Sequence, residues 1–282
     1  MKIIRSARSM KKISEDARKR RWGIGFVPTL GYLHPGHLSL IKRARGLCRV
    51  VVVSVYVNPM QFAPREDFSI YPRDPKGDAE KANAAGADYL FYPSTNVMYP
   101  KGSQTFVQVE NLTRFLCGPF RPSHFRGVTT VVAKLFEIIE PHRAFFGQKD
   151  YQQFRVIQQM VKDLHMKVKI EMCPTIREHD GLAMSSRNSY LSPKERRAGI
   201  SLFRSLQRAK ILVSKGEFSS SRIRRSMMKE FEEKAKFKLE YLSICDAQTL
   251  QEVTTVRKKT LIALAAWVGK TRLIDNILLR GE

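Results

Sequence analysis

A run of valines in the first quarter of the chain restricts its fold more than any other stretch. Residues 50–57 read Val-Val-Val-Val-Ser-Val-Tyr-Val, a nearly continuous β-branched series. A strand with apolar side chains on both faces is typical of a parallel sheet that helices cover on both sides. The polar residues Asn58 and Gln61 follow directly. They would lie at the carboxyl end of that strand, where ligands collect in open α/β sheets.

The surrounding chain alternates between short apolar runs and segments with helical periodicity, which indicates βαβ units and a right-handed parallel sheet. An alternating stretch at 105–109 predicts a further strand, in a hairpin or at a sheet edge. The other predicted strands are 24–27, 88–93, 144–146 and 166–173, and the predicted helices include 11–21, 75–85 and 128–139. A polar loop at 147–153 is expected to open a further helix, which runs to about residue 164.

A polar stretch at 174–188, with the turn signal Asp180-Gly181, suggests a domain boundary. The chain beyond it has a helical pattern to about residue 237. Three short strand-like pieces follow, at 240–244, 260–266 and 272–277. We therefore expect a first domain over 1–175 and a smaller α+β domain over 176–282.

Composition places the chain among ordinary globular proteins, with 282 residues of which 43% are hydrophobic and 27% charged. No apolar run approaches the ~20 residues of a membrane span, and the first residues lack the apolar segment of a secretory signal. The four cysteines form no C-x-x-C pair, which argues against a zinc or redox motif. Thiols rather than disulfides suit a reducing compartment, so we expect a cytoplasmic protein.

The formal net charge is +24, from 50 basic and 26 acidic residues. Such a charge raises the possibility of a nucleic-acid partner. The basic residues are spread along the chain, however, and no RNA-binding, zinc-finger or helix-turn-helix signature accompanies them. Nucleic-acid binding is therefore not expected as the main function, although an RNA-binding role for the basic surface stays an alternative.

The stretch 26–38 begins as a strand, turns and becomes a helix. Pro28 is expected to end the strand, while Gly31 and Gly36 permit tight turns. His34 and His37 are three residues apart at the predicted helix start, so their rings point in about the same direction. A helix N-terminus offers N–H groups and partial positive charge, so this stretch predicts a phosphate site. The alternative is that the two histidines merely cap the helix.

Two further polar loops complete a candidate site. One contains Lys149, Asp150 and Gln153, and the other is Met184-Ser185-Ser186-Arg187. Imidazoles, hydroxyls and cationic side chains suit a polyanion. Gln61 and Gln153 are neutral and hydrogen-bond in both directions, so they suit a polar substrate that is not a phosphate.

Six stretches in order resemble the pantoate–β-alanine ligase family of the H-x-G-H nucleotidyltransferase superfamily: PTLGYLHPGH, VNPMQF…EDFSIYPRD, HFRGVTTVVAKLF, FFGQKDYQQ, PTIREHDGLAMSSRNSYL and AAWVGKTRLIDNI. They cover essentially the full length. The resemblance implies a Rossmann-type doubly wound parallel sheet, a smaller C-terminal lid domain and a homodimer. It also implies a reaction of ATP, pantoate and β-alanine with Mg²⁺, through pantoyl adenylate to pantothenate, AMP and pyrophosphate.

The resemblance also implies roles for individual residues. His37 occupies the family's proton-donor position, and we expect it to act beside His34 as a charge-stabilising donor to the phosphates. Lys149 would contact phosphate, Asp150 the ribose, and Ser185, Ser186 and Arg187 would form a mobile phosphate loop like the K-M-S-K-S loop of class I tRNA synthetases. The ATP-binding set is Leu30, Gly31, Tyr32, Leu33, His34, Pro35, Gly36, His37, Gly147, Gln148, Lys149, Asp150, Ile176 (through its backbone), Met184, Ser185, Ser186 and Arg187.

The second substrate and the metal have fewer candidates. Gln61 and Gln153 would bind pantoate, and Gln61 also β-alanine, with Arg126 and Tyr71 as further candidates. Mg²⁺ would be held mainly by phosphates, with Asp78 as a candidate ligand. Another H-x-G-H nucleotidyltransferase, which transfers AMP to a phosphate, stays an alternative. Gln61 and Gln153 argue against it, because a phosphate acceptor favours cationic side chains.

Four residues depart from the family pattern: Leu30 replaces methionine, Tyr32 a small residue, Gln148 a glutamate and Ala63 a glycine. Leucine and methionine have similar volumes, so the first change should be tolerated. Tyr32 would crowd or cover the nucleotide loop, and Gln148 removes a negative charge beside Lys149.

Overall fold

The computed structural model describes residues 1–64, 66–232, 237–257 and 259–279. The chain forms two compact units. The N-terminal unit comprises Met1–Glu110, Arg121–Gln148 and Gln153–Pro174, and the C-terminal unit comprises Asn111–Phe120, Lys149–Gln152 and Thr175–Glu282. The division expected at 175/176 assigned the short segments 111–120 and 149–152 to the first domain. They pack instead with the C-terminal unit.

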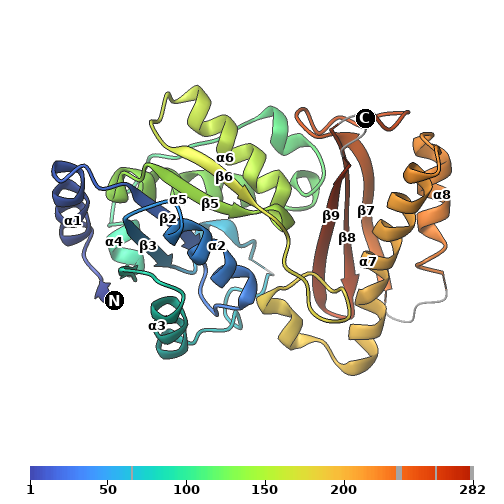
Figure 1. The fold of residues 1–282 in the computed structure, drawn as a ribbon. Coiled ribbons are helices and arrows are strands. Elements are labelled where there is room, and N and C mark those ends of the chain that lie inside the picture. Colours follow the sequence, from blue (N-terminus) through green and yellow to red (C-terminus); the bar gives the residue numbers. More distant parts are fainter. Residues whose placement is uncertain (65, 233–236, 258, 280–282) are drawn as a thin grey trace. The chain divides into compact units, whose positions relative to one another are not determined.

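The N-terminal unit contains a six-stranded sheet in the order β1-β4-β3-β2-β5-β6, and every neighbouring pair is parallel (Figure 1). This arrangement confirms the expected doubly wound α/β fold. The strands are β1 Lys2–Ile4, β2 Ile24–Thr29, β3 Val50–Val55, β4 Tyr89–Phe91, β5 Arg143–Gly147 and β6 Lys169–Cys173.

Helices cover both faces of this sheet because successive side chains of each strand point to opposite faces. On one face Phe26 and Val52 join a core with α1, α5 and α6. On the other face Val27 and Val53 pack with α2 and α3. The valine run is therefore buried on both sides, as expected. The helices are α1 Ala7–Lys19, α2 Pro35–Arg45, α3 Pro75–Ala84, α4 Thr95–Met98, α5 His124–Ile139 and α6 Tyr151–Asp163.

The expectation that Pro28 ends its strand is wrong, because β2 continues through Pro28 to Thr29 in register with β3. The Thr29 carbonyl accepts the Tyr56 N–H at 3.1 Å, so Pro28 directs its backbone groups toward the β5 side. On that side β2 pairs only through Gly25 and Phe26. The missing N–H of Pro28 therefore interrupts no ladder bond.

Two further details differ from the sequence-based expectation. The stretch 105–109 is not a strand. Its central residue lies against α5, where the Val107 N–H donates to Thr130 Oγ1 at 3.0 Å and Thr129 Oγ1 donates to the Val107 carbonyl at 2.5 Å. The strand β1 was not expected, because the charged residues Lys2 and Arg5 flank only two apolar residues. It pairs with β4 from Lys2 to Ile4.

The C-terminal unit contains an antiparallel sheet, in which β8 lies between β7 and β9 (Figure 1). Its strands are β7 Phe237–Asp246, β8 Thr260–Val268 and β9 Thr271–Leu279. Helices α7 Pro193–Ser214 and α8 Ser220–Met228 bury Leu202, Leu206 and Ile223 against this sheet. The long helical pattern is thus two helices, with Gly216 at a φ of 86° between them. Among the described residues, no helix is both long and apolar enough to span a membrane.

Candidate active site

The order of the strands defines a switch point in the N-terminal unit. From β2 the chain proceeds to β3 and β4 on one side, whereas β5 and β6 lie on the other. In open α/β sheets, ligands bind at the carboxyl ends of the strands that flank such a point. The loop that leads from β2 into α2 begins there, and β5 ends there at Gly147, followed by Gln148.

The loop after β2 is held by Asp78, a residue of α3. The Tyr32 N–H donates to Asp78 Oδ2 at 2.9 Å, and the Leu33 N–H donates to Oδ1 at 2.6 Å. Gly31 has a φ of 88° and Tyr32 a φ of 51°. A Cβ on Gly31 would lie 2.9 Å from Asp78 Oδ2, so the close approach also requires glycine. Burial raises the pKa of Asp78, and the two N–H donors offset this only in part.

His34 and His37 form the start of α2. The Gly36 N–H donates to His34 Nδ1 at 3.1 Å, and the His34 N–H donates to His37 Nδ1 at 3.3 Å. The rings are stacked, with their centroids 4.0 Å apart. Because a backbone N–H can only donate, both Nδ1 atoms accept, and each neutral ring carries its proton on Nε2. The two histidines therefore do cap the helix, and this capping fixes both as Nε2–H donors.

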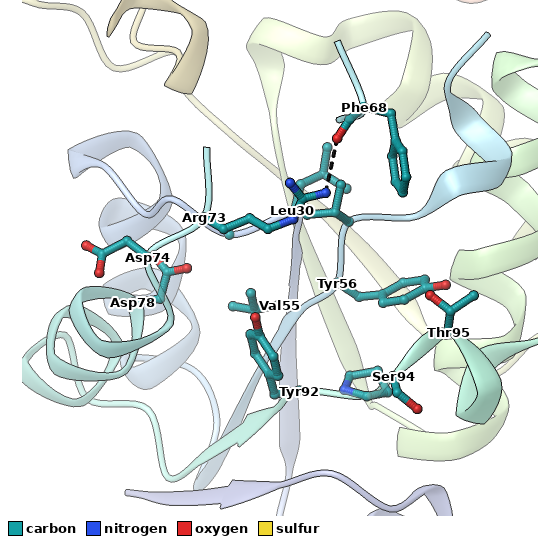
Figure 2. Close-up of a pocket in the computed structure, with 13 residues that line it drawn as sticks. Leu30, Val55, Tyr56, Phe68, Arg73, Asp74, Asp78, Tyr92, Ser94 and Thr95 are labelled. Carbon is teal, nitrogen blue, oxygen red and sulfur yellow. Dashed lines mark hydrogen bonds between the residues drawn. The ribbon is translucent and has the colours of Figure 1, made fainter. Parts of the chain in front are cut away.

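A cavity of about 210 Å³ lies beside this loop (Figure 2). Leu30 and Gly31 line it, together with residues at the ends of β3 and β4. The Arg73 guanidinium also faces it and donates to the carbonyls of Phe68 and Tyr71 at 3.0 Å. The other lining residues are Val55, Tyr56, Val57, Phe68, Asp74, Asp78, Tyr92, Pro93, Ser94 and Thr95.

Gln61 is buried at the end of the short 3₁₀ helix η1, Pro59–Gln61. Its side-chain carbonyl accepts from Asn58 Nδ2 at 3.2 Å, and the same nitrogen donates to the Gly127 carbonyl at 3.0 Å. A Cβ on Gly127 would meet the Met60 carbonyl oxygen at 2.3 Å. Glycine at this position of α5 therefore permits the close packing of η1 that places Gln61.

His124, the first residue of α5, contacts the backbone of Gln61. His124 Nδ1 lies 2.9 Å from the backbone carbonyl oxygen of Gln61, which also accepts from Arg121 Nη2 at 3.2 Å. Since a carbonyl only accepts, Nδ1 carries the proton, and Nε2 accepts from Arg121 Nη1 at 3.2 Å. Sequence reasoning missed this residue because only the folded chain brings α5 to η1.

Three other candidates lie in the N-terminal unit. Gln153 is half-buried in the first turn of α6. Tyr71 is buried, with its ring 5.9 Å from that of Phe62. Arg126 is exposed, and its guanidinium carbon lies 4.8 Å from the centre of the Phe106 ring.

The remaining candidates belong to the C-terminal unit. Lys149 is half-buried and Asp150 exposed, both in the 3₁₀ turn η4, Gln148–Asp150. Ile176 presents its carbonyl to the Met184 N–H at 3.0 Å, which closes a hairpin. Ser185 begins the 3₁₀ helix η5, Ser186–Tyr190, and its hydroxyl accepts from the Arg187 N–H at 3.3 Å.

Ion pairs fix the hairpin that precedes this serine pair. Arg196 of α7 donates to Glu178 at 2.6 Å and to Asp180 at 2.8 Å, and Asn188 Nδ2 donates to Glu178 Oε1 at 2.6 Å. Burial tends to raise the pKa of Asp180, but the Leu182 N–H and the Arg196 guanidinium together bring it below its usual value. Asp180 is thus held as a carboxylate at the turn that the sequence predicted.

The predicted nucleotide set is therefore divided. Leu30 to His37, Gly147 and Gln148 lie in the N-terminal unit with the two glutamines, whereas Lys149, Asp150, Ile176 and Met184 to Arg187 lie in the C-terminal unit. Sequence reasoning assigned no role to Arg177, Asp275 or Asn276, which contact the second group. The available signal was the adjacent polar pair Asp275-Asn276 between the apolar residues 273–274 and 277–279.

The chain matches a known protein family over nearly its whole length. A family model described as pantoate-beta-alanine ligase matches residues 2–278. The chain is 52% identical over 279 residues to the pantothenate synthetase of Thermotoga petrophila, covering 99% of this chain and 100% of that protein. Pantothenate synthetase from Thermus thermophilus has a similar crystal structure, with a TM-score of 0.94, 42% identity and coverage of 98% and 99% of the two chains.

A further similar structure is that of pantoate-beta-alanine ligase from Francisella tularensis, complexed with β-γ ATP and β-alanine. Its TM-score is 0.80 and its identity 34%, over 99% of this chain and 97% of that one. The family model and the relatives each extend over nearly all of the sequence, and the expected sequence blocks, the doubly wound sheet and the histidine-capped helix occur together. The chain belongs to the pantoate–β-alanine ligase family.

Proposed function

We propose that this ligase works through pantoyl adenylate, with His34 and His37 as donors to the phosphates of ATP. The overall reaction is the ATP-dependent condensation of pantoate with β-alanine. The observation that carries the proposal is the stacked histidine pair at the start of α2, in which both Nδ1 atoms accept backbone N–H groups. Both rings are thereby set as Nε2–H donors at the switch point of the sheet.

The chemistry explains why ATP is needed. A carboxylate is a poor acyl donor until one of its oxygens becomes part of a leaving group. An oxygen of pantoate attacks the α-phosphorus, and the bond to the bridging oxygen breaks to release pyrophosphate. The amine of β-alanine then attacks the acyl carbon, loses a proton and displaces AMP. No enzyme nucleophile is required, so catalysis rests on positioning and on stabilisation of phosphate charge.

The candidate residues divide these tasks. Lys149 and the segment Ser185-Ser186-Arg187 would stabilise the phosphates, and Asp150 would accept from the ribose. Gln61 and Gln153 would hold pantoate. The buried amide of Gln61, fixed by Asn58, suits hydroxyl and carboxylate groups because it hydrogen-bonds in both directions. The similar enzyme from Francisella tularensis was crystallised with β-alanine, which supports an amine acceptor.

Mg²⁺ would enter with ATP and be held mainly by its phosphates, where it neutralises their charge. The residues around Asp78 do not fit a direct metal site. Both of its oxygens already accept backbone N–H groups. Among the described residues, no group of three or more histidine, cysteine, aspartate or glutamate side chains could hold a metal ion. We therefore propose that Asp78 holds the loop after β2 and does not bind the metal ion.

A homodimer and a cytoplasmic location complete the proposal. The dimer is supported by the family resemblance, and light scattering on the purified protein should give twice the mass of one chain. The location is supported by Cys48, Cys117, Cys173 and Cys245, which are all buried and form no disulfide with one another.

The reaction can be tested in two steps. With ATP, Mg²⁺ and pantoate, the enzyme should exchange pyrophosphate into ATP, and exchange should require pantoate. Addition of β-alanine should then yield pantothenate and AMP in equal amounts. Exchange without amide formation would favour a nucleotidyltransferase that stops at AMP transfer. Folded protein that shows neither reaction would contradict the proposal.

Replacement of Lys149 tests the phosphate site. Lys149→Ala should lower the pantoate-dependent exchange rate about 10²–10³-fold, because it removes one electrostatic donor to the developing charge. Lys162→Ala is a matched control, because Lys162 is an exposed lysine in the last turn of α6. An unchanged rate in Lys149→Ala would remove this lysine from the site.

A further inference from the structure

Strand β9 carries two adjacent polar residues that are almost fully buried. Asp275 and Asn276 are each only 3% exposed, and they pair with Leu264 and Ala263 of β8. Burial of polar groups is unfavourable unless they find partners. Because neighbouring residues of a strand point to opposite faces, the two side chains need partners on both sides of the sheet. Those partners are segments of the candidate active site.

Asp275 holds the hairpin that leads to the serine pair. Its carboxylate accepts two hydrogen bonds from the Arg177 guanidinium, at 2.6 and 3.0 Å. Arg177 Nη1 also donates to the Gly181 carbonyl at 3.0 Å, and Arg177 pairs with Ala183 across the hairpin. One ion pair thus fixes both arms and the turn between them.

Asn276 holds the other segment. Its Nδ2 donates to the backbone carbonyl of Lys149 at 2.8 Å. The neighbours of Lys149 are fixed within the same unit, since Tyr151 Oη donates to the Ala247 carbonyl at 3.0 Å and Gln152 accepts from the Cys117 N–H at 3.0 Å. These bonds explain why residues 149–152 belong to the C-terminal unit although they lie between β5 and α6 in the sequence.

The two anchors are coupled, because Asp275 Oδ1 also accepts the Asn276 N–H at 2.8 Å. We propose that Asp275 and Asn276 are positioning residues that fix Lys149 and the hairpin 176–184 to one strand, so that Lys149 and the Ser185-Ser186-Arg187 segment keep one geometry toward the same nucleotide. The proposal rests on the function proposed above for these phosphate-binding residues. Neither Asp275 nor Asn276 needs to touch the substrate.

The test uses Asn276→Ala, which removes the bond to the Lys149 carbonyl. We expect the kcat/KM for ATP in pantoate-dependent exchange to fall at least tenfold, with the KM for pantoate unchanged. Glu240→Gln is the matched control. Glu240 lies on β7, its side chain is only 8% exposed, and it accepts from Trp267 of β8 and Arg272 of β9. This control should change the kcat/KM for ATP by less than twofold.

A double-mutant cycle separates positioning from general damage to the sheet. Because Asn276 acts through Lys149, Lys149→Ala combined with Asn276→Ala should be no slower than Lys149→Ala alone, within about twofold. Additive losses, or equal losses in Asn276→Ala and Glu240→Gln, would overturn the proposal. Unchanged exchange in Lys149→Ala would instead contradict the proposed phosphate role, so the two failures are distinguishable.

Hydrogen exchange provides a second readout that needs no activity. In Asn276→Ala the amides of residues 149–152 should exchange faster, whereas those paired between β7 and β8 should not. If this variant does not fold, Asn276→Ser takes its place, because serine retains a small hydrogen-bond donor. The exchange of the amides of residues 149–152 should then accelerate as well, but by less. Unaltered protection of 149–152 in a folded variant would contradict the anchoring role.

Discussion

Asp78 and Asp275 are both buried carboxylates that hold a loop of the candidate active site, but their partners differ. Asp78 of the N-terminal unit accepts two backbone N–H groups from the loop after β2. Asp275 of the C-terminal unit faces the guanidinium of Arg177 in a bidentate pair. Asp78 stabilises a turn with positive φ angles by accepting from N–H dipoles, whereas Asp275 neutralises the positive charge of Arg177. Removal of the Asp78 carboxylate therefore takes an acceptor from two backbone N–H groups. Removal of the Asp275 carboxylate instead takes the counter-ion from the Arg177 guanidinium.

The largest effect is expected for Asp275→Ala. Arg177 would lose its counter-ion while its side chain remains only 21% exposed. Removal of one partner from a buried pair typically costs about 3–5 kcal/mol, so the free energy of unfolding should fall by about that amount. Urea unfolding measures it. Arg177→Ala in the Asp275→Ala background should restore part of the loss, and a further loss would show that the unpaired charge is not the cause.

A smaller effect is expected for Asp78→Asn. The amide keeps the shape of the side chain but places an NH₂ group against one of the two backbone N–H groups of the loop. One buried donor without an acceptor costs about 1–3 kcal/mol. Glu80→Gln, an exposed residue on the same helix, serves as the control in the same urea experiment. A loss for Asp78→Asn as large as that for Asp275→Ala would erase the distinction between the two anchors.

The smallest effect is a pH dependence with a defined sign. Burial raises the pKa of Asp78 above 3.8, so its proton is held more tightly in the folded state. Its contribution to stability is then present below pH 3.8 and is lost as the pH rises through the folded pKa. The difference in unfolding free energy between wild type and Asp78→Asn should therefore shrink as the pH rises from 3.8 through the folded pKa of Asp78.

Asp180 provides the opposite case. Its pKa lies below 3.8, because the Leu182 N–H and Arg196 outweigh its burial. Its contribution is present above pH 3.8 and is lost as the pH falls through the folded pKa. The gap between wild type and Asp180→Asn should thus grow with rising pH, as measured by urea unfolding in the acid range. Equal slopes for the two variants would contradict the assignment of both carboxylates.

Much of the fold was predictable because each internal strand carries its own signal. The valine run of β3 indicated a sheet covered on both faces, and the pattern around residues 26–38 indicated the turn from β2 into α2. The strand β1 was missed because Lys2 and Arg5 flank only two apolar residues. The stretch 105–109 alternates like a strand, yet α5 satisfies its central backbone groups through two threonine hydroxyls. Pro28 was misjudged because its effect depends on which neighbour its backbone faces.

Sequence reasoning could propose site residues where the side chains themselves carry the chemistry, as with His34, His37 and Lys149. The supporting residues were not, because their partners are remote in the sequence. Asp78 lies 45 residues from Leu33, Asp275 lies 98 residues from Arg177, and Asn276 lies 127 residues from Lys149. In the sequence, the residues next to such an acid or amide do not distinguish it from any other polar residue on a helix surface or in a strand.

The sequence alone determined the doubly wound sheet and the family, and it supplied the candidate residues of the site, because periodicity and short motifs are local properties of the chain. Only the tertiary structure decided that both histidines accept at Nδ1 and that residues 149–152 belong to the C-terminal unit. It also decided that Asp78 holds a loop. These features depend on hydrogen bonds to a particular partner, and a buried polar group acquires that partner only when distant segments of the chain pack together.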